Sequence, residues 1–437
     1  MSPVRRVALT SSAAVAVALG GCASPAEPGG QESTPSGGSS PSEDSSTDTD
    51  GPSSRKRHRT RLNSATTAAA QYDYAGALKE LKGLTGTDVD ALTRKITKQQ
   101  TNAVTWPDNS QISHLFFHSL IVDADRAFTS QDSAQGYADY MVTIDEFKAV
   151  LDSVHEKGYV LVNPRDVARE NAQGQMEYVP ITLPKGKKPL VISQDDVSYY
   201  EYMDGDGFAQ SMTLDDDGGV TNTYEDPDGK TVEGSYDMPA VVDDFVEEHP
   251  DFSYRGSKGV LALTGYNGVL GYRTSEIEYG DEEDIDLQEQ QEQAKGVADE
   301  LKEDGWVFAS HSWGHTNFTK ATMTRLTADT QKWDEEVAPI LGETDLLIFP
   351  FGADIGGTQD YSGPKYDLLE EHGFDFYFGI DTSAPAWGQR TDDYVRQARI
   401  NVDGLSMSAA MKDDQHVLHD FFDVEEVIDP TRAEHGF

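Results

Sequence analysis

Two histidines four residues apart, His311 and His315, stand in the stretch "FASHSWGHTNF". If this stretch makes a helical turn, the spacing lets both imidazoles face one point, where they could bind a metal ion. The residue after His311 is Ser312, so the pattern is not that of the metalloproteases, which place a glutamate there. Two surface histidines without a ligand are the alternative, and the stretch alone does not separate these interpretations.

Acidic and imidazole side chains also end other apolar runs of the chain. Asp195 and Asp196 close the run "PLVISQDD", and His118 lies in "HLFFHSL". The run "LLIFPFGAD" ends in a Pro-Phe-Gly turn that contains Phe351. Each run is typical of a strand, so polar groups gather where several strands end. Adjacent aspartates also cap helices and begin turns, which is the simpler interpretation of Asp195 and Asp196 taken alone.

One aspartate and two histidines form a borderline-soft set of ligands. Such a set suits Zn²⁺ and also Co²⁺ or Ni²⁺, and three protein ligands leave a position open for water. A second carboxylate beside the ligating one can take a proton from that water. The residue types therefore favour a hydrolytic metal site, if the fold brings the strand ends together.

The elements that must position these residues alternate along the chain. From about residue 112, apolar strand-like runs such as "KPLVISQDD" and "KGVLALTG" alternate with helical patterns such as "PAVVDDFVEEH". Repeated β-then-α units predict a parallel sheet covered by helices, and their number favours a barrel over an open sheet. Barrel enzymes carry their chemistry where the strands end and the loops begin.

One stretch, about residues 200–237, interrupts this alternation. It holds two Asp-Gly turns between β-prone runs, which predicts an inserted acidic β-hairpin. The segment "DGDGF" superficially suggests a calcium loop. The EF-hand pattern fails at Phe208 and Ala209, so turn chemistry is the better account.

Five motifs in order resemble one known family. "LVISQDDVSYY" resembles the Thr-Phe-Asp-Asp-Gly motif of the NodB-type polysaccharide deacetylases, carbohydrate esterase family 4. "SHSWGH" is similar to their His-(Ser/Thr)-x-x-His motif, and "IFPFGAD" to their Pro-Tyr-Gly turn. "ISHLFFHSLIVD" and the helix and strand that follow it resemble the extracellular poly-N-acetylglucosamine deacetylases. The resemblance spans residues 112–404.

The resemblance implies a distorted (β/α) barrel and a role for each motif residue. Asp195 would be the general base, and His118 the catalytic acid that protonates the leaving amine. The backbone N–H of Phe351 would help to stabilise the oxyanion. The metal, zinc above all, would be held by the remaining three residues: Asp196, His311 and His315.

Some residues depart from the family pattern. Gln194 replaces a phenylalanine, Val197 replaces the glycine after the aspartates, and Ile348 stands where many members carry an arginine that orients the base. Arg399 is a candidate to supply that missing charge. Four aromatic residues are candidates for stacking on sugar rings, although packing is the default for such side chains: Tyr199, Tyr200, Trp313 and Trp387.

The N-terminal sequence predicts export. Two arginines precede an apolar run that ends in "LGGC", so residues 1–22 resemble a bacterial lipoprotein signal that lipidates Cys22. A plain signal peptide is the alternative. Cys22 is the only cysteine, so the exported domain holds no disulfide. We therefore expect a cell-surface protein attached to the membrane through Cys22.

Composition divides the rest of the chain. Residues 23–65, rich in Ser, Pro, Gly and Asp, predict a disordered tether. A basic patch at residues 55–61 in this tether would contact an anionic surface, or would be a solvated linker. Residues 66–104 predict a short helical lead-in, and residues 105–437 the catalytic domain.

The net charge of −42 argues against nucleic acid as a partner, because phosphate recognition needs clustered Lys and Arg. The expected function is metal-dependent removal of N-acetyl groups from an amino-sugar polymer. Two alternatives stay open, an O-acetyl esterase of the xylan type and a non-catalytic surface protein that binds glycan or metal.

Overall fold

The structure is a computed structural model that describes residues 52–437. The predicted lipoprotein signal and residues 23–51 of the tether lie outside the described residues. Within residues 52–437, no helix combines the length and the apolar composition that crossing a bilayer requires.

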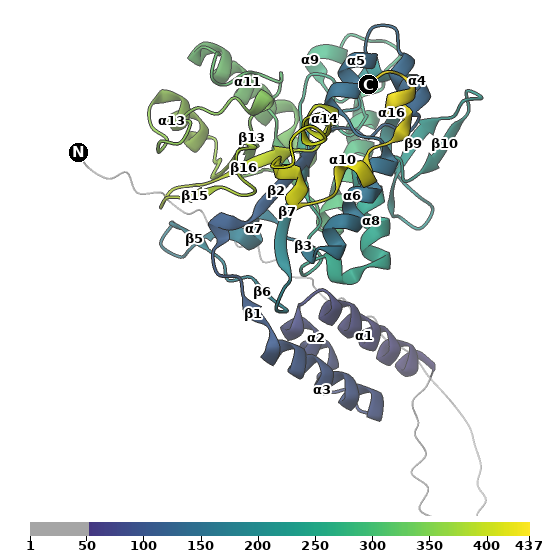
Figure 1. Ribbon diagram of the computed structural model, residues 1–437, viewed down its shortest axis with the longest axis vertical. Helices are drawn as coiled ribbons and strands as arrows, with labels where there is room; N and C mark the ends of the chain where they lie inside the picture. The colour runs from purple at the N-terminus through teal and green to yellow at the C-terminus, as the bar shows by residue number, and fades with distance from the viewer. Residues whose placement is uncertain (1–51) are drawn as a thin grey trace, which may run out of the picture. The chain divides into compact units, whose positions relative to one another are not determined.

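Seven parallel strands close into a ring. Figure 1 shows some of them, β2, β7, β13 and β16, in the middle of the domain. Their order is β11-β12-β13-β14-β16-β2-β7, and β11 pairs back onto β7. The predicted (β/α) barrel is therefore confirmed. The strands of the ring are β2 (Ser113–Phe117), β7 (Lys188–Gln194), β11 (Val260–Leu263), β12 (Val307–Ser310), β13 (Leu346–Ile348), β14 (Phe376–Ile380) and β16 (Val395–Asn401).

Strand register brings the polar strand ends to one edge of the barrel. Phe117 of β2 and Leu261 of β11 are both paired with Gln194, the last residue of β7. The residues after β2 and β7, His118 and Asp195, therefore emerge at the same level. Strand β3 (Tyr159–Leu161) pairs only with the first half of β7, so it lies outside the ring.

Strand β16, "VRQARIN", escaped prediction from the sequence. Its Gln397 and Arg399 bond to His114 and Asp195, which lie on β2 and directly after β7. A strand that carries long polar side chains into the barrel has no apolar alternation to reveal it. This strand closes the ring between β14 and β2.

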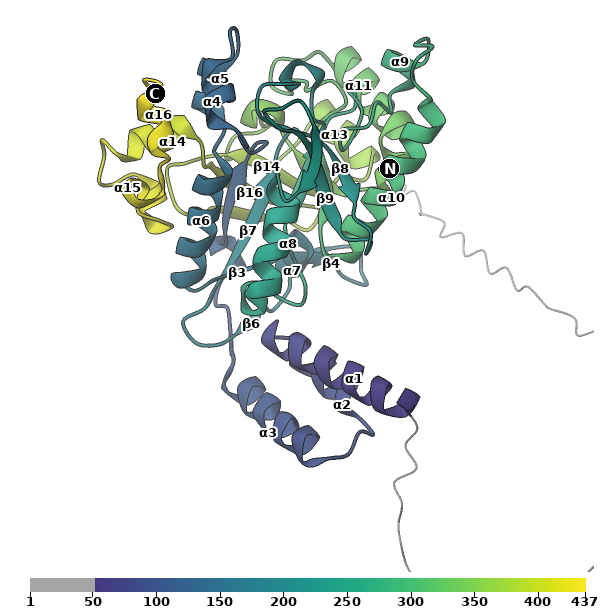
Figure 2. The ribbon, with the colours of Figure 1, turned by 90° about the vertical axis from the view of Figure 1, so that its right-hand side faces the viewer.

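Helices cover the outside of the ring (Figure 2). Helix α6 begins after Thr143, whose side chain accepts from Glu146 N while the Glu146 carboxylate accepts from Thr143 N, a capping box. Apolar residues of the covering helices share buried clusters with the strands. These helices are α6 (Ile144–Glu156), α8 (Met238–Glu248), α10 (Leu287–Glu303), α11 (Met323–Glu336) and α13 (Pro364–Glu371).

The insertion is a three-stranded antiparallel sheet, so the prediction of a single hairpin is wrong. Strand β9 (Val220–Glu225) pairs with β8 (Ala209–Leu214) on one side and with β10 (Thr231–Gly234) on the other. The two Asp-Gly turns each join a pair of strands, and two turns in succession make three strands. Asn222 in the central strand links this sheet to the barrel, as described below.

The lead-in has three helices, α1 (Pro52–Ala70), α2 (Tyr74–Leu81) and α3 (Thr87–Asn102). Helix α1 includes the basic patch, so the prediction of a disordered tether is wrong for residues 52–65. Arg, Lys and Ala are strong helix formers, and they outweigh the polar composition that suggested disorder. Helix α1 also gains tertiary support, because Ala65 and Ala69 share a buried cluster with Ala77 of α2.

Short elements connect the main ones. The strands among them are β1 (Val104–Thr105), β4 (Ala168–Glu170), β5 (Met176–Tyr178), β6 (Thr182–Leu183) and β15 (Gly388–Arg390). The helices among them are α4 (Ala124–Thr129), α5 (Ala134–Tyr140), α7 (Pro164–Val167), α9 (Glu276–Tyr279), α12 (Ala338–Leu341), α14 (Gly404–Ala410), α15 (Val424–Val427) and α16 (Pro430–Glu434).

Candidate active site

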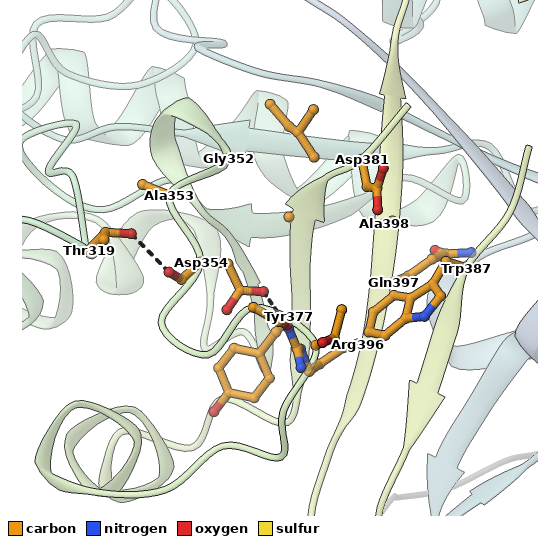
Figure 3. A pocket seen from close by; sticks show the side chains of 14 residues that line it. Thr319, Gly352, Ala353, Asp354, Tyr377, Asp381, Trp387, Arg396, Gln397 and Ala398 are labelled. Carbon is orange, nitrogen blue, oxygen red and sulfur yellow. Dashed lines mark hydrogen bonds and ion pairs between the residues drawn. The ribbon is translucent and has the colours of Figure 1, made fainter. Parts of the chain in front are cut away.

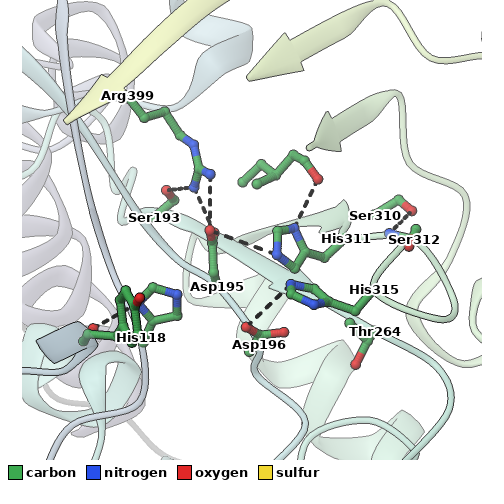
Figure 4. A network of polar contacts seen from close by, with 12 residues as sticks. His118, Ser193, Asp195, Asp196, Thr264, Ser310, His311, Ser312, His315 and Arg399 are labelled. Atoms are coloured by element: carbon green, nitrogen blue, oxygen red, sulfur yellow. Dashed lines mark hydrogen bonds and ion pairs between the residues drawn. The ribbon is translucent and has the colours of Figure 1, made fainter. Parts of the chain in front are cut away.

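The residues singled out in the sequence meet at the carboxyl edge of the barrel (Figure 4). Asp195 and Asp196 directly follow β7, and His118 directly follows β2. His311 directly follows β12, and His315 lies four residues further on. The strand ends therefore converge as the parallel register requires.

Asp196, His311 and His315 each offer one ligand atom to a common point. These three atoms lie within 4.8 Å of one another, and His315 Nε2 is 3.8 Å from Asp196 Oδ2. A tetrahedral zinc ion with bonds of about 2.0–2.1 Å separates its donors by roughly 3.3 Å. The donor types fit a divalent metal. Side-chain rotations that move the donor atoms by a few tenths of an ångström to about 1.5 Å would bring them to this separation.

His311 is already oriented as a ligand. Its Nδ1 lies 2.9 Å from the Ile348 carbonyl, so Nδ1 carries the proton and donates it, and Nε2 keeps its lone pair for the metal side. Burial lowers the pKa of His311, which favours the neutral imidazole that a metal needs. Ile348 thus contributes its backbone carbonyl at the position where many family members carry an arginine side chain.

The segment that carries His315 is an irregular turn, so the two imidazoles come together without the helical turn that the spacing argument assumed. Ser312 and His315 have φ of 58° and 47°, in the left-handed region. The buried carboxylate of Asp329 on α11 holds the turn, accepting from Trp313 N at 2.9 Å and from Gly314 N at 3.0 Å. Asp329 also accepts from the Thr316 hydroxyl at 2.6 Å. Asp329 is a positioning residue that no local motif announced.

Asp196 is oriented by Tyr200. The Tyr200 hydroxyl donates to Asp196 Oδ1 at 2.6 Å, which leaves Oδ2 on the side of His315. Asp196 itself takes the left-handed conformation, with φ of 61°. Val197, in the place of the family's glycine, is fully buried in the core instead. The turn after β7 is therefore shaped at Asp196, and it does not need a glycine at position 197.

Asp195 is held by a buried arginine, as the sequence suggested for Arg399. Arg399 Nη1 donates to Asp195 Oδ1 at 2.7 Å and Nη2 to Oδ2 at 3.0 Å. Burial alone would raise the pKa of Asp195, but the Arg399 guanidinium and then His311 hold it well below its usual range. Asp195 is therefore ionised, and its Oδ2 lies 3.9 Å from His311 Nε2, next to the ligand cluster.

His118 is oriented by the backbone. Its Nδ1 lies 3.0 Å from the Tyr140 carbonyl, so Nδ1 donates there and Nε2 stays available for proton transfer. The imidazole is half-buried. This arrangement fits an acid or base at the mouth of the site.

Phe351 lies in the turn that follows β13, in the 3₁₀ segment η4 (Pro350–Gly352). Its φ of 61° is left-handed, and its side chain is 63% exposed. The ring centroid is 4.3 Å from that of His315. The structure thus places this turn beside the ligand cluster.

Gln194 joins the site to the insertion, which explains one departure from the family pattern. Its amide Nε2 donates to both oxygens of Asp237, at 2.8 and 2.9 Å. The Tyr199 hydroxyl donates to Asp237 at 2.6 Å, and Asp237 N donates to Asn222 of β9 at 3.0 Å. This buried network ties the end of β7 to the inserted sheet, and a phenylalanine at 194 could not take part in it.

Three of the four aromatic candidates for sugar contact are packed, as the default interpretation held. Tyr199, Tyr200 and Trp313 are only 4%, 5% and 7% exposed, so these three rings are packed and do not face a substrate. Trp387 is half-buried and lines a hollow of about 300 Å³ beside Gly352 (Figure 3). Of the four proposed aromatics, only Trp387 therefore stays a candidate.

A different aromatic residue faces solvent beside the site. Tyr202, in the 3₁₀ segment η2 (Glu201–Met203), is 61% exposed and stacks on Tyr200 with ring centroids 5.6 Å apart and planes at 14°. Tyr200 in turn bonds to Asp196. Tyr202 and Phe351 are thus two exposed rings, one next to the Asp196 side of the cluster and one next to His315.

The carboxyl edge of this parallel barrel carries two carboxylates and three imidazoles, a set of groups that can serve metal-assisted hydrolysis. The family model described as polysaccharide deacetylase matches residues 285–377, a segment that contains His311, His315 and Phe351. Over these residues the chain is similar to the polysaccharide deacetylase family, which agrees with the resemblance in its motifs.

The other comparisons add little. A search of curated proteins finds no match. Among solved structures, Streptococcus pyogenes deacetylase PplD in complex with acetate is similar at 13% sequence identity and a TM-score of 0.36. That match covers 69% of this chain and 94% of the other. A TM-score this low supports no comparison of individual residues.

Proposed function

We propose that this protein is a metal-dependent deacetylase that removes N-acetyl groups from an amino-sugar polysaccharide. Two neighbouring features carry the proposal. The first is the cluster of Asp196, His311 and His315. The second is the ionised carboxylate of Asp195, which Arg399 holds beside that cluster. The first suits a divalent cation such as Zn²⁺, with Co²⁺ or Ni²⁺ as alternatives. The second is an ionised carboxylate, which can accept a proton.

The residues divide the work of amide hydrolysis. A divalent cation held by the cluster would supply Lewis-acid polarisation and would lower the pKa of a water molecule. Asp195 accepts the proton of the attacking water, and Arg399 fixes both of its oxygens during the transfer. His118 donates a proton through Nε2 to the leaving amine, and the backbone N–H of Phe351 donates to the oxyanion.

Substrate binding is supported by the exposed rings beside the cluster. An aromatic face packs well against the apolar face of a pyranose ring. Tyr202 and Phe351 are both more than half exposed. We assign them to the sugar rings next to the N-acetyl group that is cleaved, with Trp387 lining a further hollow.

Asp195→Asn tests the mechanism directly. The variant is expected to bind metal as the wild type does, because Asp195 is not a ligand, and to lose acetate release by about 10²–10⁴-fold, because the base is gone. Metal content and acetate release from N-acetylated chitooligosaccharides are the two measurements. Asp243→Asn, at another largely buried aspartate paired with a cation, Lys258, is the matched control and should keep activity.

Three outcomes would contradict parts of the proposal. Full acetate release by Asp195→Asn would show that Asp195 is not the general base. Activity of the wild type on acetylated xylan but not on chitooligosaccharides would assign an O-acetyl esterase. A purified chain that neither holds metal nor releases acetate from any of these glycans would assign a non-catalytic binding protein.

Location at the cell surface is part of the proposal, and it rests on the sequence that ends in "LGGC". Lipidation of Cys22 would hold the protein in the membrane fraction. Cys22→Ala should release it to the medium or leave its signal uncleaved. An unlipidated mature N-terminus in the wild type would contradict this part alone.

A further inference from the structure

The basic residues of helix α1 are segregated from the rest of the protein's charge. Residues 55–61 hold five Lys and Arg and no acidic residue, whereas residues 103–437 hold 23 Lys and Arg against 67 Asp and Glu. The remainder of α1, residues 62–70, has no charged side chain. One end of one helix therefore carries a concentrated positive charge in a strongly acidic protein.

Four of these five cations make no ion pair in the described part of the chain. Arg55, Lys56, Arg57 and Arg59 are exposed, and none of them forms an ion pair within residues 52–437. Arg61 differs from them. Its guanidinium donates to the carbonyls of Glu80 and Lys82, at 2.6 and 3.1 Å, and this fastens α1 to α2.

The position of these four cations also does not favour the helix. Arg55 lies in the first turn of α1, where the amino end of the helix dipole disfavours positive charge, and the other three lie in the next turn. No acidic residue in the first turn compensates them. Helices usually carry acidic and not basic residues at their amino ends. A departure from this preference without a compensating contact in the fold suggests that the cations bind something other than this protein. The second half of α1 is anchored by buried Ala65 and Ala69, so the first half presents its charges on a supported helix.

The composition of this end shows what kind of contact it can make. The sequence of residues 52–61, "PSSRKRHRTR", offers no apolar side chain beyond Pro52. The helix end therefore has no apolar face to insert among acyl chains, unlike an amphipathic membrane helix. Its attraction is to an anionic surface, through Coulomb forces that salt will screen.

We propose that the amino-terminal end of α1, through Arg55, Lys56, Arg57 and Arg59, docks on the anionic phospholipid headgroups of a bilayer. Basic side chains close to an anionic leaflet are each attracted to it. Residues 103–437 are acidic and are repelled by the same surface, so docking orients the chain with α1 toward the lipid. Only residues 23–51 lie between Cys22 and α1 in the sequence, which favours a bilayer over a polymer further from the anchor. The choice of a bilayer rests on the proposed anchor at Cys22, and the inference does not depend on deacetylase activity.

Vesicle binding tests the proposal. The full chain with Cys22→Ala, which cannot be lipidated, is incubated with phosphatidylcholine vesicles with or without phosphatidylglycerol, and bound protein is measured by flotation. Any binding through the apolar segment before Cys22 is common to both vesicle types. The gain caused by phosphatidylglycerol is expected to fall at least about tenfold when the four cations are changed to Gln. The gain should also vanish near 1 M salt, where the screening length is about 3 Å.

A second set of four cations in the lead-in provides the matched control. Lys79, Arg94, Lys95 and Lys98 are exposed on α2 and α3, and changing them to Gln removes the same charge. This variant should keep most of the gain. An equal loss in both variants would overturn the α1 site, and so would the absence of any gain from phosphatidylglycerol for the chain in which neither set is changed. Retained vesicle binding by the α1 variant with loss of binding to soluble poly(glycerol phosphate) would assign the helix to a wall polymer instead.

Discussion

Arg399→Met is expected to damage both stability and the pH range of activity, because Arg399 neutralises the base. The two side chains are 0% and 4% exposed, and the guanidinium spans both oxygens of Asp195. Removing one member of such a pair leaves a charge buried without a partner, which costs about 3–5 kcal/mol. Loss of a cation at this range raises the pKa of a carboxyl group by about one to three pH units.

The sign of the pH dependence follows from Asp195. In the wild type its pKa lies below that of the unfolded chain, so its stabilisation is present above about pH 4 and is lost as the pH falls further. In Arg399→Met, burial is unopposed by Arg399 and the pKa of Asp195 rises. Protonation then relieves the buried charge. The variant's deficit in unfolding free energy should be largest at neutral pH and should shrink toward pH 4.

Two measurements and two controls make this prediction sharp. Urea unfolding between about pH 4 and pH 8, the range that the shift of the Asp195 pKa covers, gives the deficit in unfolding free energy. Acetate release over the same range gives the pH at which activity falls on the acid side, and this pH should be higher in Arg399→Met. Arg396→Met removes another buried arginine of β16, paired with Asp354 at 2.7 Å, and should lower stability without moving that limb. Arg399→Lys should be intermediate, because one ammonium cannot bridge both oxygens. An Arg399→Met protein with the wild-type acid limb and a pH-independent deficit would refute the reasoning.

Three further predictions concern the ligands, the substrate rim and the link to the insertion. His315→Ala removes one nitrogen donor and should lose metal on dialysis, measured by elemental analysis, whereas His372→Ala, at a surface ion pair, should keep it; equal metal content in both would exclude His315 as a ligand. Tyr202→Ala should raise KM for chitooligosaccharides with little change in kcat, and Tyr202→Phe should restore it; an unchanged KM in the alanine variant would place the sugar elsewhere. Gln194→Ala removes the donor to both oxygens of Asp237 and should lower the free energy of unfolding by about 1–3 kcal/mol in urea. A stability equal to that of the wild type would show that the network is not needed to hold the insertion.

Much of the barrel and the residues that meet at its carboxyl edge could be predicted from the sequence. The alternation of apolar runs with helical patterns is a local property, and it indicates a covered parallel sheet before any contact is known. The strand ends then place Asp195, Asp196, His311 and His315 at one edge, because parallel strands share a direction. The roles of these residues remain predictions, but their proximity did not require a structure to anticipate.

The shape of the turns was beyond sequence reasoning. The four-residue spacing of His311 and His315 suggested a helical turn, but Asp329 on the next helix holds the segment in a left-handed turn. Tyr200 was expected to be packed unless it contacted sugar, and its role as a buried donor to Asp196 was not anticipated. In both cases a partner outside the local pattern decided the conformation.

Polar composition also led to wrong or missing predictions of secondary structure. The basic patch suggested a disordered linker, whereas residues 52–70 form a helix that packs on α2. Strand β16 was missed because Gln397 and Arg399 point into the barrel, where an apolar alternation would have announced a strand. Composition describes solvation on average, and it does not show when a polar side chain has a buried partner.

The sequence by itself determined which chemical groups this protein has and that several of them end strands. Only the tertiary structure decided how they act together. Arg399 reaches Asp195 across 204 positions of sequence because β16 and β7 both flank β2 in a closed ring. That contact keeps the Asp195 carboxylate ionised. It depends on strand order and register, which arise from packing across the whole chain and leave no mark in any short stretch of it.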